Sequence, residues 1–141
     1  MGTLKDKEAV ARFNKKQKEL NSLPAIDYEA VNQTKWEYYR LLFRQDGEKT
    51  LSSKGFKEFF DANKEWLQPY AVFSYLRDAY KTPNFREWPK YSTYHAKEIE
   101  KMCQPETADY PHIALYFYIQ YHLHLQLLAA TQYAREQGVA L

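Results

Sequence analysis

The sequence predicts an all-α chain. Apolar residues recur at three- and four-residue intervals along most of the 141 residues, which is the period of a helix buried on one face. Helix-capping residues separate these stretches, and there are only four glycines in the chain. Aromatic residues make up 17% of the sequence, which is typical of a folded, ring-rich interior and not of a disordered tail. The length corresponds to about one ordinary domain.

Two helices are predicted in the first third of the chain. Residues 4–20 carry a thin apolar stripe among many charged residues, which predicts an exposed helix that ends at residues 21–24. Asp27 is suited to cap a second helix, and Gly47 is predicted to end it. The residues that recur with helical spacing in that second helix are Val31, Tyr38, Leu41 and Leu42.

The middle third is predicted to contain shorter elements. Ser52 or Ser53 can cap a third helix with phenylalanines on one side, and Asn63 is predicted to break it. Pro69 suits the first position of a further helix over residues 70–80. Residues 81–95 show no sustained period and predict a structured loop.

The last third predicts one short and one long helix. Residues 96–102 form the short helix, and residues 111–137 show no helix breaker until Gly138, a residue suited to follow a helix C-terminus. The long helix would measure about 40 Å at 1.5 Å per residue. Its apolar residues are distributed over nearly all sides of the helix, so we expect other structural elements to pack against it on every side. Residues 139–141 predict the start of a buried strand that ends with the chain.

Composition and charge exclude several classes of protein. The net charge is +2 with both signs mixed along the chain, so we expect no nucleic-acid partner. No apolar run is long enough to span a bilayer, and no apolar leader segment opens the chain. A single cysteine, Cys103, cannot form an internal disulfide. We therefore expect no membrane partner and a cytoplasmic location.

Metal, acid–base and nucleophilic chemistry find little support in the sequence. His122 and His124 are two residues apart on a helix, which turns them about 200° from each other, so they cannot chelate one ion together. We expect no metal site and no cofactor. Nothing in the sequence supplies Cys103 with an activating base. The acidic residues that could act as paired catalytic carboxylates lie next to Lys and Arg in amphipathic stretches, where solvated ion pairs are the expected role. They are Asp61, Glu65, Asp78, Glu98 and Glu100.

Five aromatic residues have two open interpretations. Flat rings with a polar edge suit the faces of sugars as well as a protein core, and core packing is the more common role. These residues are Trp66, Tyr70, Trp88, Tyr91 and Tyr94.

Four blocks of the sequence together resemble one enzyme family. They are NKEWLQPYAVFSYLRD (63–78), FREWPKY (85–91), YIQYHLHLQ (118–126) and YAREQGVAL (133–141). The combination resembles the 4-alpha-glucanotransferases of glycoside hydrolase family 77, also called amylomaltases or disproportionating enzymes. The resemblance covers residues 20–141.

The resemblance implies a (β/α)8 barrel enzyme with helical insertions. Residues 1–24 would be an exposed helix and linker, residues 25–109 a helical insertion subdomain, and residues 110–141 one barrel helix and the start of a truncated strand. The full-length enzyme would transfer segments of α-1,4-glucans and maltooligosaccharides by a retaining double displacement. The family's nucleophilic Asp, acid/base Glu and stabilising Asp lie beyond residue 141, so no catalytic residue is assigned here. We expect a piece of a longer protein that is inactive alone.

Within this piece, Trp88 and Tyr91 are the candidate substrate-binding residues, because a ring-rich loop beside a barrel mouth can form part of a sugar groove. The alternative function is a free-standing helical interaction module. In either case the long apolar helix could self-associate.

Overall fold

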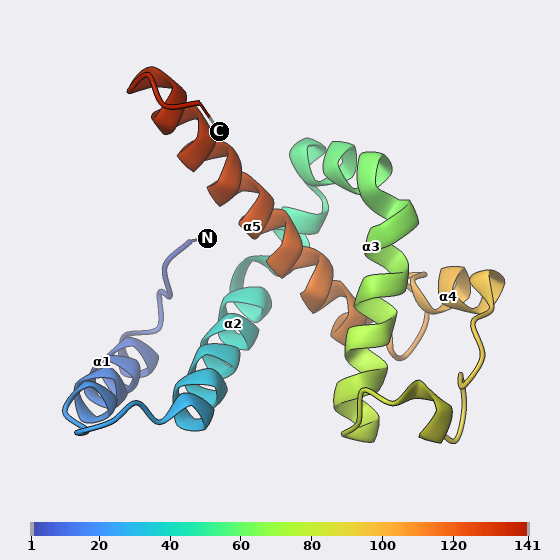
Figure 1. Cartoon of the computed structure of the whole chain (residues 1–141), viewed down its shortest axis with the longest axis horizontal. Coiled ribbons are helices and arrows are strands. Elements are labelled where there is room, and N and C mark those ends of the chain that lie inside the picture. The colour runs from blue at the N-terminus through green and yellow to red at the C-terminus, as the bar shows by residue number, and fades with distance from the viewer. Residues whose placement is uncertain (1, 141) are drawn as a thin grey trace. The chain divides into compact units, whose positions relative to one another are not determined.

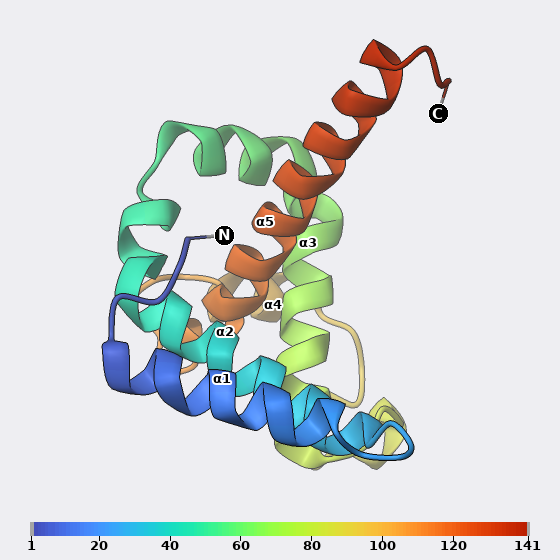
Figure 2. The same cartoon turned by 90° about the vertical axis from the view of Figure 1, so that its left-hand side faces the viewer.

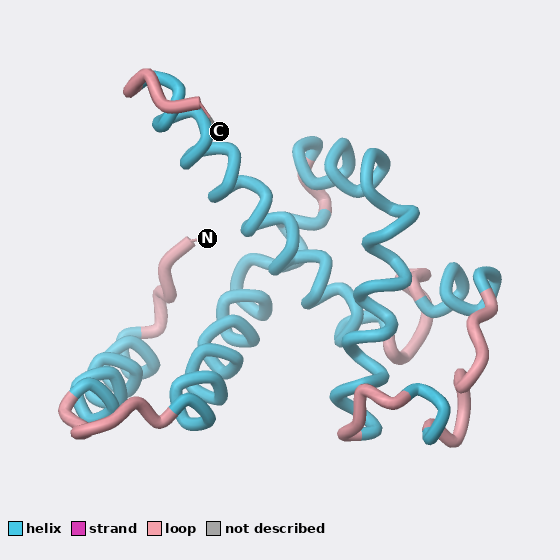
Figure 3. The backbone as a smooth tube through the Cα atoms, viewed as in Figure 1, coloured by secondary structure: helices cyan, strands magenta, loops and turns pink. Residues whose placement is uncertain are grey.

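The computed structural model describes residues 2–140, and they form helices joined by loops, with no strand among them (Figure 3). This confirms the all-α prediction for the chain. The helices are α1 (Lys7–Asn21), α2 (Tyr28–Leu51), α3 (Lys54–Tyr80), the 3-10 helix η1 (Phe85–Glu87), α4 (Ala96–Met102) and α5 (Tyr110–Glu136). None of the described helices is both long and apolar enough to cross a bilayer.

The chain divides into two compact units between Thr50 and Leu51. The first unit contains α1 and nearly all of α2, and the second contains α3, η1, α4 and α5. The functional boundaries expected after residues 24 and 109 concern the complete enzyme and stay predictions.

In the first unit both helices begin at a capping aspartate. Asp6 accepts hydrogen bonds at its Oδ1 from the backbone N–H groups of Glu8 (2.9 Å) and Ala9 (3.2 Å). Asp27 does the same for the N–H of Ala30 at 3.0 Å, as the sequence predicted. These carboxylates satisfy amide groups that have no partner within the first turn and complement the positive end of the helix dipole.

An aromatic contact joins the first two helices, and the segment before α1 is bonded to α2. The rings of Phe13 and Tyr38 meet edge to face with centroids 5.2 Å apart. Gln45 holds the segment that precedes α1: its Oε1 accepts from Lys5 N at 2.8 Å and its Nε2 donates to Thr3 O at 3.0 Å. The side-chain amide of Gln45 therefore fixes the N-terminal segment to α2 through two hydrogen bonds to its backbone.

Gly47 does not end α2, so that prediction is wrong. The helix continues to Leu51, and Gly47 is buried within it. A Cβ at this position would lie 2.5 Å from Cδ2 of Phe43, one turn earlier. The glycine is therefore used for the close approach of a ring and not for a left-handed turn.

The expected break at Asn63 and new start at Pro69 are also wrong, because α3 is one helix from Lys54 to Tyr80. Ser53 caps it, accepting at Oγ from Phe56 N at 3.2 Å. Asn63 turns its Nδ2 back to Phe59 O at 2.8 Å, so its side chain is satisfied by its own helix. Pro69 has no N–H to donate, and α3 bends in its middle without ending (Figures 1 and 2).

Tertiary packing explains why α3 continues through its proline. Leu67 and Ala71, on either side of Pro69, are completely buried. Helix α5 crosses α3 and supplies the fully buried Ile113 and, at 1% exposure, Tyr118 (Figure 1). Burial of this apolar surface offsets the lost backbone hydrogen bond, since each large apolar side chain contributes about 1.5–3 kcal/mol.

A row of aromatic contacts joins the first half of α3 to the middle of α5. Phe56 meets Tyr121 edge to face, with ring centroids 5.6 Å apart, and Phe60 meets Phe117 at 5.3 Å. His124 packs on Phe59 at 4.9 Å. The imidazole of His124 is thus part of this row of aromatic contacts between α3 and α5.

Only the first half of α5 is surrounded by other elements of this chain, so neighbours around its second half stay a prediction about the complete protein. Residues 113–118 are buried, whereas the apolar side chains after His124 are exposed, and Figures 1 and 2 both show this half extending beyond α3. The exposed side chains of this second half include Leu125, Leu127, Leu128 and Tyr133.

Gly138 ends α5 as predicted. Its φ is 77°, its N–H donates to Arg135 O at 3.0 Å, and the N–H of Val139 reaches back to Ala134 O at 2.9 Å. This pair of bonds is the Schellman motif, which needs a left-handed residue and favours glycine. Val139 and Ala140 have no regular secondary structure, and Leu141, the last residue of the expected strand, lies outside the described residues.

Candidate functional site

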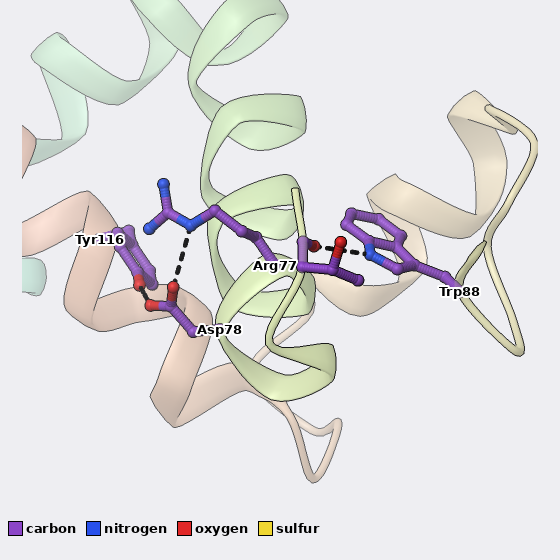
Figure 4. Close-up of polar contacts among 5 residues, drawn as sticks. Arg77, Asp78, Trp88 and Tyr116 are labelled. Atoms are coloured by element: carbon purple, nitrogen blue, oxygen red, sulfur yellow. Dashed lines mark hydrogen bonds and ion pairs between the residues drawn. The ribbon is translucent and has the colours of Figure 1, made fainter. Parts of the chain in front are cut away.

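The loop between α3 and α4 is anchored on Trp88. Its side chain is only 5% exposed, and its indole Nε1–H donates to Thr82 O at 3.0 Å (Figure 4). Lys81, in the left-handed conformation at φ 57°, ends α3 and turns the chain into the loop. Burying an indole is favourable when its N–H keeps a partner, and here a loop carbonyl supplies it.

Three further rings surround Trp88. Its ring centroid lies 5.4 Å from that of Phe73, 5.8 Å from Tyr80 and 6.5 Å from Phe85. Phe73 and Tyr80 come from α3, and Phe85 from η1. The loop is therefore held on the end of α3 by tilted and edge-to-face aromatic contacts, which explains how fifteen residues without a long helix hold a fixed shape.

A pocket of about 330 Å³ lies between the second half of α3, this loop and α4. Its apolar lining includes Val72 and Leu76 from α3 and Ile99 and Met102 from α4, with Trp88 as a wall. Polar groups come from one stretch at the end of the loop and the start of α4. They are Tyr91, Thr93, Tyr94, His95 and Glu98.

Tyr91 stands between this pocket and a more polar recess of about 360 Å³. It lines both, as do Thr93, His95 and Glu98, and Lys90 belongs to the recess alone. The φ of Tyr91 is 64°, a conformation that costs a non-glycine residue about 1–3 kcal/mol and that clusters at binding sites. An apolar wall next to hydrogen-bonding side chains suits a sugar ring, which has apolar faces and hydroxyl edges.

The carboxylate of Asp78, near the end of α3, accepts two hydrogen bonds, one from α5 and one from its neighbour on α3. Tyr116 donates its hydroxyl to Oδ2 of Asp78, and Arg77 Nε donates to Oδ1 of the same carboxylate at 2.9 Å (Figure 4). Burial and the bond to Asp78 raise the pKa of Tyr116. The bond to Asp78 likewise raises the pKa of Arg77, so both donors keep their protons and the carboxylate is used in packing.

A second tyrosine–aspartate pair fixes the entry to α5. Tyr75 donates to Asp109 Oδ1 at 2.8 Å, and its ring stacks on His112 with centroids 5.5 Å apart. Burial, followed by the bond to Asp109, raises the pKa of Tyr75 to about 12. Both tyrosine–aspartate pairs lie outside the pocket lining, and each joins α3 to α5 or to the residue before it.

The structure brings the two candidate substrate-binding residues, Trp88 and Tyr91, to one pocket, and it adds Tyr94. It buries Trp88 and leaves Tyr94 66% exposed. Trp66 and Tyr70 lie outside this lining. Phe73 and Phe85 also line the pocket and were not predicted to do so, although the spacing of Pro69, Val72, Phe73 and Leu76 along α3 was a signal for one helix face.

The groups considered for metal binding and nucleophilic catalysis do not form a site. No cluster of three or more His, Cys, Asp or Glu side chains suited to a metal occurs among residues 2–140. Cys103 is buried, and burial raises the pKa of its thiol to about 12, so little thiolate forms at neutral pH. Among the acidic candidates, Glu98 alone lines the pocket.

Comparison with known proteins places the chain in a family. Residues 2–141 match the family model of glycoside hydrolase family 77, described as 4-alpha-glucanotransferase. The chain is 38% identical to the 4-alpha-glucanotransferase DPE2 of Oryza sativa subsp. japonica over 116 residues, which are 82% of this chain and 12% of that protein. It is 28% identical over 147 aligned positions to the 4-alpha-glucanotransferase of Chlamydia caviae, covering 100% of this chain and 27% of that protein.

The Chlamydia pneumoniae 4-alpha-glucanotransferase is 25% identical over 124 residues, 87% of this chain and 23% of that protein. No solved structure matches the chain significantly. The chain thus spans between about an eighth and a quarter of these curated relatives. Because the family match extends over residues 2–141, the chain belongs to the 4-alpha-glucanotransferase family, glycoside hydrolase family 77.

Proposed function

We propose that this chain is part of a 4-alpha-glucanotransferase that moves α-1,4-glucan segments between maltooligosaccharides or to glucose. Its membership of the family supports this, together with the names of its relatives. The proposed compartment is the cytoplasm, since the lone Cys103 forms no internal disulfide.

The proposed chemistry is a retaining double displacement. A carboxylate forms a bond to C1 of the donor while the C1–O4 bond breaks, and a carboxylic acid gives its proton to the departing oxygen. A hydroxyl of the acceptor sugar then attacks C1 and releases the nucleophilic carboxylate. The proton of that hydroxyl passes to the residue that had protonated the departing oxygen. The resemblance puts these carboxylates beyond residue 141.

The chain alone is proposed to be inactive. A retaining site needs two carboxyl groups about 5–5.5 Å apart on either side of the scissile bond. The pocket between α3 and α4 has only one in its lining, Glu98. That single observation supports a binding role for this pocket and no catalytic one.

The proposed role of the pocket is to contact the glucan through Trp88 and Tyr91. Trp88 supplies a fixed apolar wall, and Tyr91 stands where the apolar pocket meets the polar recess. A glucosyl ring placed there would stack its apolar face on the rings and direct its hydroxyls to Thr93, His95 and Glu98.

The test compares this chain with the complete protein on maltotriose. The complete protein is expected to release glucose and produce longer maltooligosaccharides, and residues 1–141 alone are expected to release none. Glucose release by the isolated chain above that of a boiled sample would contradict the assignment of catalysis to the rest of the protein. A complete protein without transfer activity would contradict the proposed function itself.

A second candidate function, a helical interaction module, is favoured by the second half of α5. Leu127 is 67% exposed and Leu128 53% exposed on a helix that extends beyond its packing partner. In the isolated chain, such a surface favours self-association, because dimerisation removes apolar area from water. In the complete protein the same surface would be covered by the remaining chain.

A further inference from the structure

Two neighbouring aromatic side chains on α3 lie outside the pocket and are exposed. Trp66 is 47% exposed and Tyr70 is 40% exposed, and they lie one helical turn apart. Their ring centroids are 6.2 Å apart with planes inclined by 58°. Tryptophan is usually highly buried, so an adjacent exposed pair is informative about function.

The polar edges of both rings are held by neutral side chains. The indole Nε1–H of Trp66 donates to Asn63 Oδ1 at 2.9 Å, and Gln120 of α5 donates from Nε2 to the hydroxyl of Tyr70 at 3.1 Å. These bonds fix the orientation of each ring while leaving part of its face exposed. A surface with rings already oriented loses little side-chain entropy when a ligand stacks on it.

The chemistry beside the rings favours a neutral polyhydroxylated ligand. The groups that touch the ring edges are two amides, Asn63 and Gln120, which both donate and accept hydrogen bonds. The charged neighbours in the sequence, Lys64 and Glu65, are of opposite sign, so together they add no net charge that would attract a polyanion. Sugars are bound by such a combination of apolar faces and neutral hydrogen-bonding edges.

We propose that Trp66 and Tyr70 form a second glucan-binding platform on α3, which binds a part of the α-glucan chain outside the pocket. The identity of the ligand rests on the proposed function. Trp66, Tyr70 and Phe73 follow the spacing i, i+4, i+7 and so share one helix face, and Phe73 lines the pocket. Seven residues of helix rise about 10 Å, so the platform extends the pocket and favours longer glucans over short ones.

The experiment uses the complete protein and three variants. Trp66→Ala and Tyr70→Ala remove the platform, and Tyr28→Ala removes a 77% exposed aromatic side chain at the start of α2 as the matched control. The steady-state constants are measured with maltotriose and with a long maltodextrin as donor. Thermal unfolding of each variant is measured in the same buffer.

The expected result is a length-dependent loss of affinity. Each platform variant should raise KM for the long maltodextrin about three- to tenfold, as expected for one lost stacking contact. KM for maltotriose, kcat and the unfolding midpoint should stay unchanged, and Tyr28→Ala should match the wild type. Trp66→Phe, which keeps a stacking face, should recover most of the affinity for the long substrate.

Three outcomes would overturn the platform. KM for the long maltodextrin could stay unchanged in both alanine variants, or it could rise equally for maltotriose. Trp66→Ala and Trp66→Phe could also both lower the unfolding midpoint without changing either KM, in which case the rest of the protein packs on these rings. If instead the wild type transfers no glucan, the proposed function fails. In that case fluorescence tests the platform. Maltoheptaose should quench the tryptophan fluorescence of the wild type, and this quenching should be lost in Trp66→Phe. Quenching that persists in Trp66→Phe would overturn the platform.

Discussion

Gly55, in the first turn of α3, lies directly against the hydroxyl of Tyr121 of α5. A Cβ at Gly55 would be 2.5 Å from Tyr121 Oη and 3.7 Å from its Cζ. The tyrosine is held in place because its ring packs on Phe56 and Phe59. The approach of α5 to the start of α3 therefore depends on the absence of one methyl group.

Gly55→Ala is expected to destabilise the chain by about 1–3 kcal/mol, because the new methyl group overpacks the contact with Tyr121. In a Tyr121→Phe background the same change should be neutral or stabilising, since alanine has the higher helix propensity. Urea unfolding of the four proteins gives the coupling between the two sites. An equal loss in both backgrounds would show that the hydroxyl is not the obstacle.

Trp88 and Tyr91 are expected to respond differently to substitution. Trp88→Ala should cost about 3–5 kcal/mol of stability, because it empties a buried aromatic position that is 5% exposed. Tyr91→Gly should leave stability unchanged or raise it by up to about 1 kcal/mol, because glycine relieves the left-handed backbone. In the complete protein, Tyr91→Gly should nevertheless raise KM for the glucan.

Lys81→Gly is the matched control for Tyr91, since Lys81 has a similar φ of 57° and lies outside the pocket lining. It should change stability in the same direction as Tyr91→Gly and leave KM at the wild-type value. Urea unfolding and steady-state kinetics of both variants make the comparison. A KM that is unaffected by Tyr91→Gly would remove Tyr91 from the substrate-binding residues.

Stability is expected to fall at alkaline pH partly through Tyr75. Its pKa is raised from 10.0 to about 12 in the folded chain, by burial first and by the bond to Asp109 second. The unfolded chain therefore releases this proton near pH 10 while the folded chain keeps it. The stabilisation by protonated Tyr75 is complete below pH 10 and is lost as the pH rises to 12.

Urea unfolding between pH 9 and 12 tests this, with Tyr75→Phe expected to lose stability less steeply than the wild type above about pH 10. Tyr133→Phe, at a 66% exposed position, is the control and should follow the wild-type curve. Parallel curves for Tyr75→Phe and the wild type would disprove the contribution.

The isolated chain is expected to self-associate through the second half of α5. Light scattering at several concentrations should show a mass that rises above 16.9 kDa with concentration. Leu127→Lys should restore the monomer, because it charges the apolar surface, whereas Gln126→Lys on the neighbouring face should not. A monomer at every concentration would refute the self-association.

The helices whose limits depend on local chemistry could be predicted from the sequence. Asp27 and Ser53 cap their helices through side-chain bonds to amides three residues away, and Gly138 ends α5 with a positive φ. Residues 96–102 form the expected short helix. In each case the interactions that decide the boundary lie within one turn of it, so a local pattern is sufficient.

Breaks inside helices could not be predicted, because neighbouring elements decide them. Gly47, Asn63 and Pro69 are all weak helix residues, yet α2 and α3 pass through them. Phe43 covers Gly47, Asn63 bonds to its own helix, and burial of Leu67 and Ala71 holds α3 together around Pro69. Propensity is a weak prior that tertiary packing overrides.

For the candidate site, the sequence by itself determined the composition: a loop rich in aromatic residues that contains Trp88 and Tyr91, and a resemblance to a family. Only the tertiary structure decided the roles of these rings, since it buried Trp88, placed Tyr91 between an apolar pocket and a polar recess, and left Trp66 exposed. The physical reason is that a ring gains similar free energy from burial in a core or beneath a ligand. Which of the two occurs depends on neighbours that are distant in sequence.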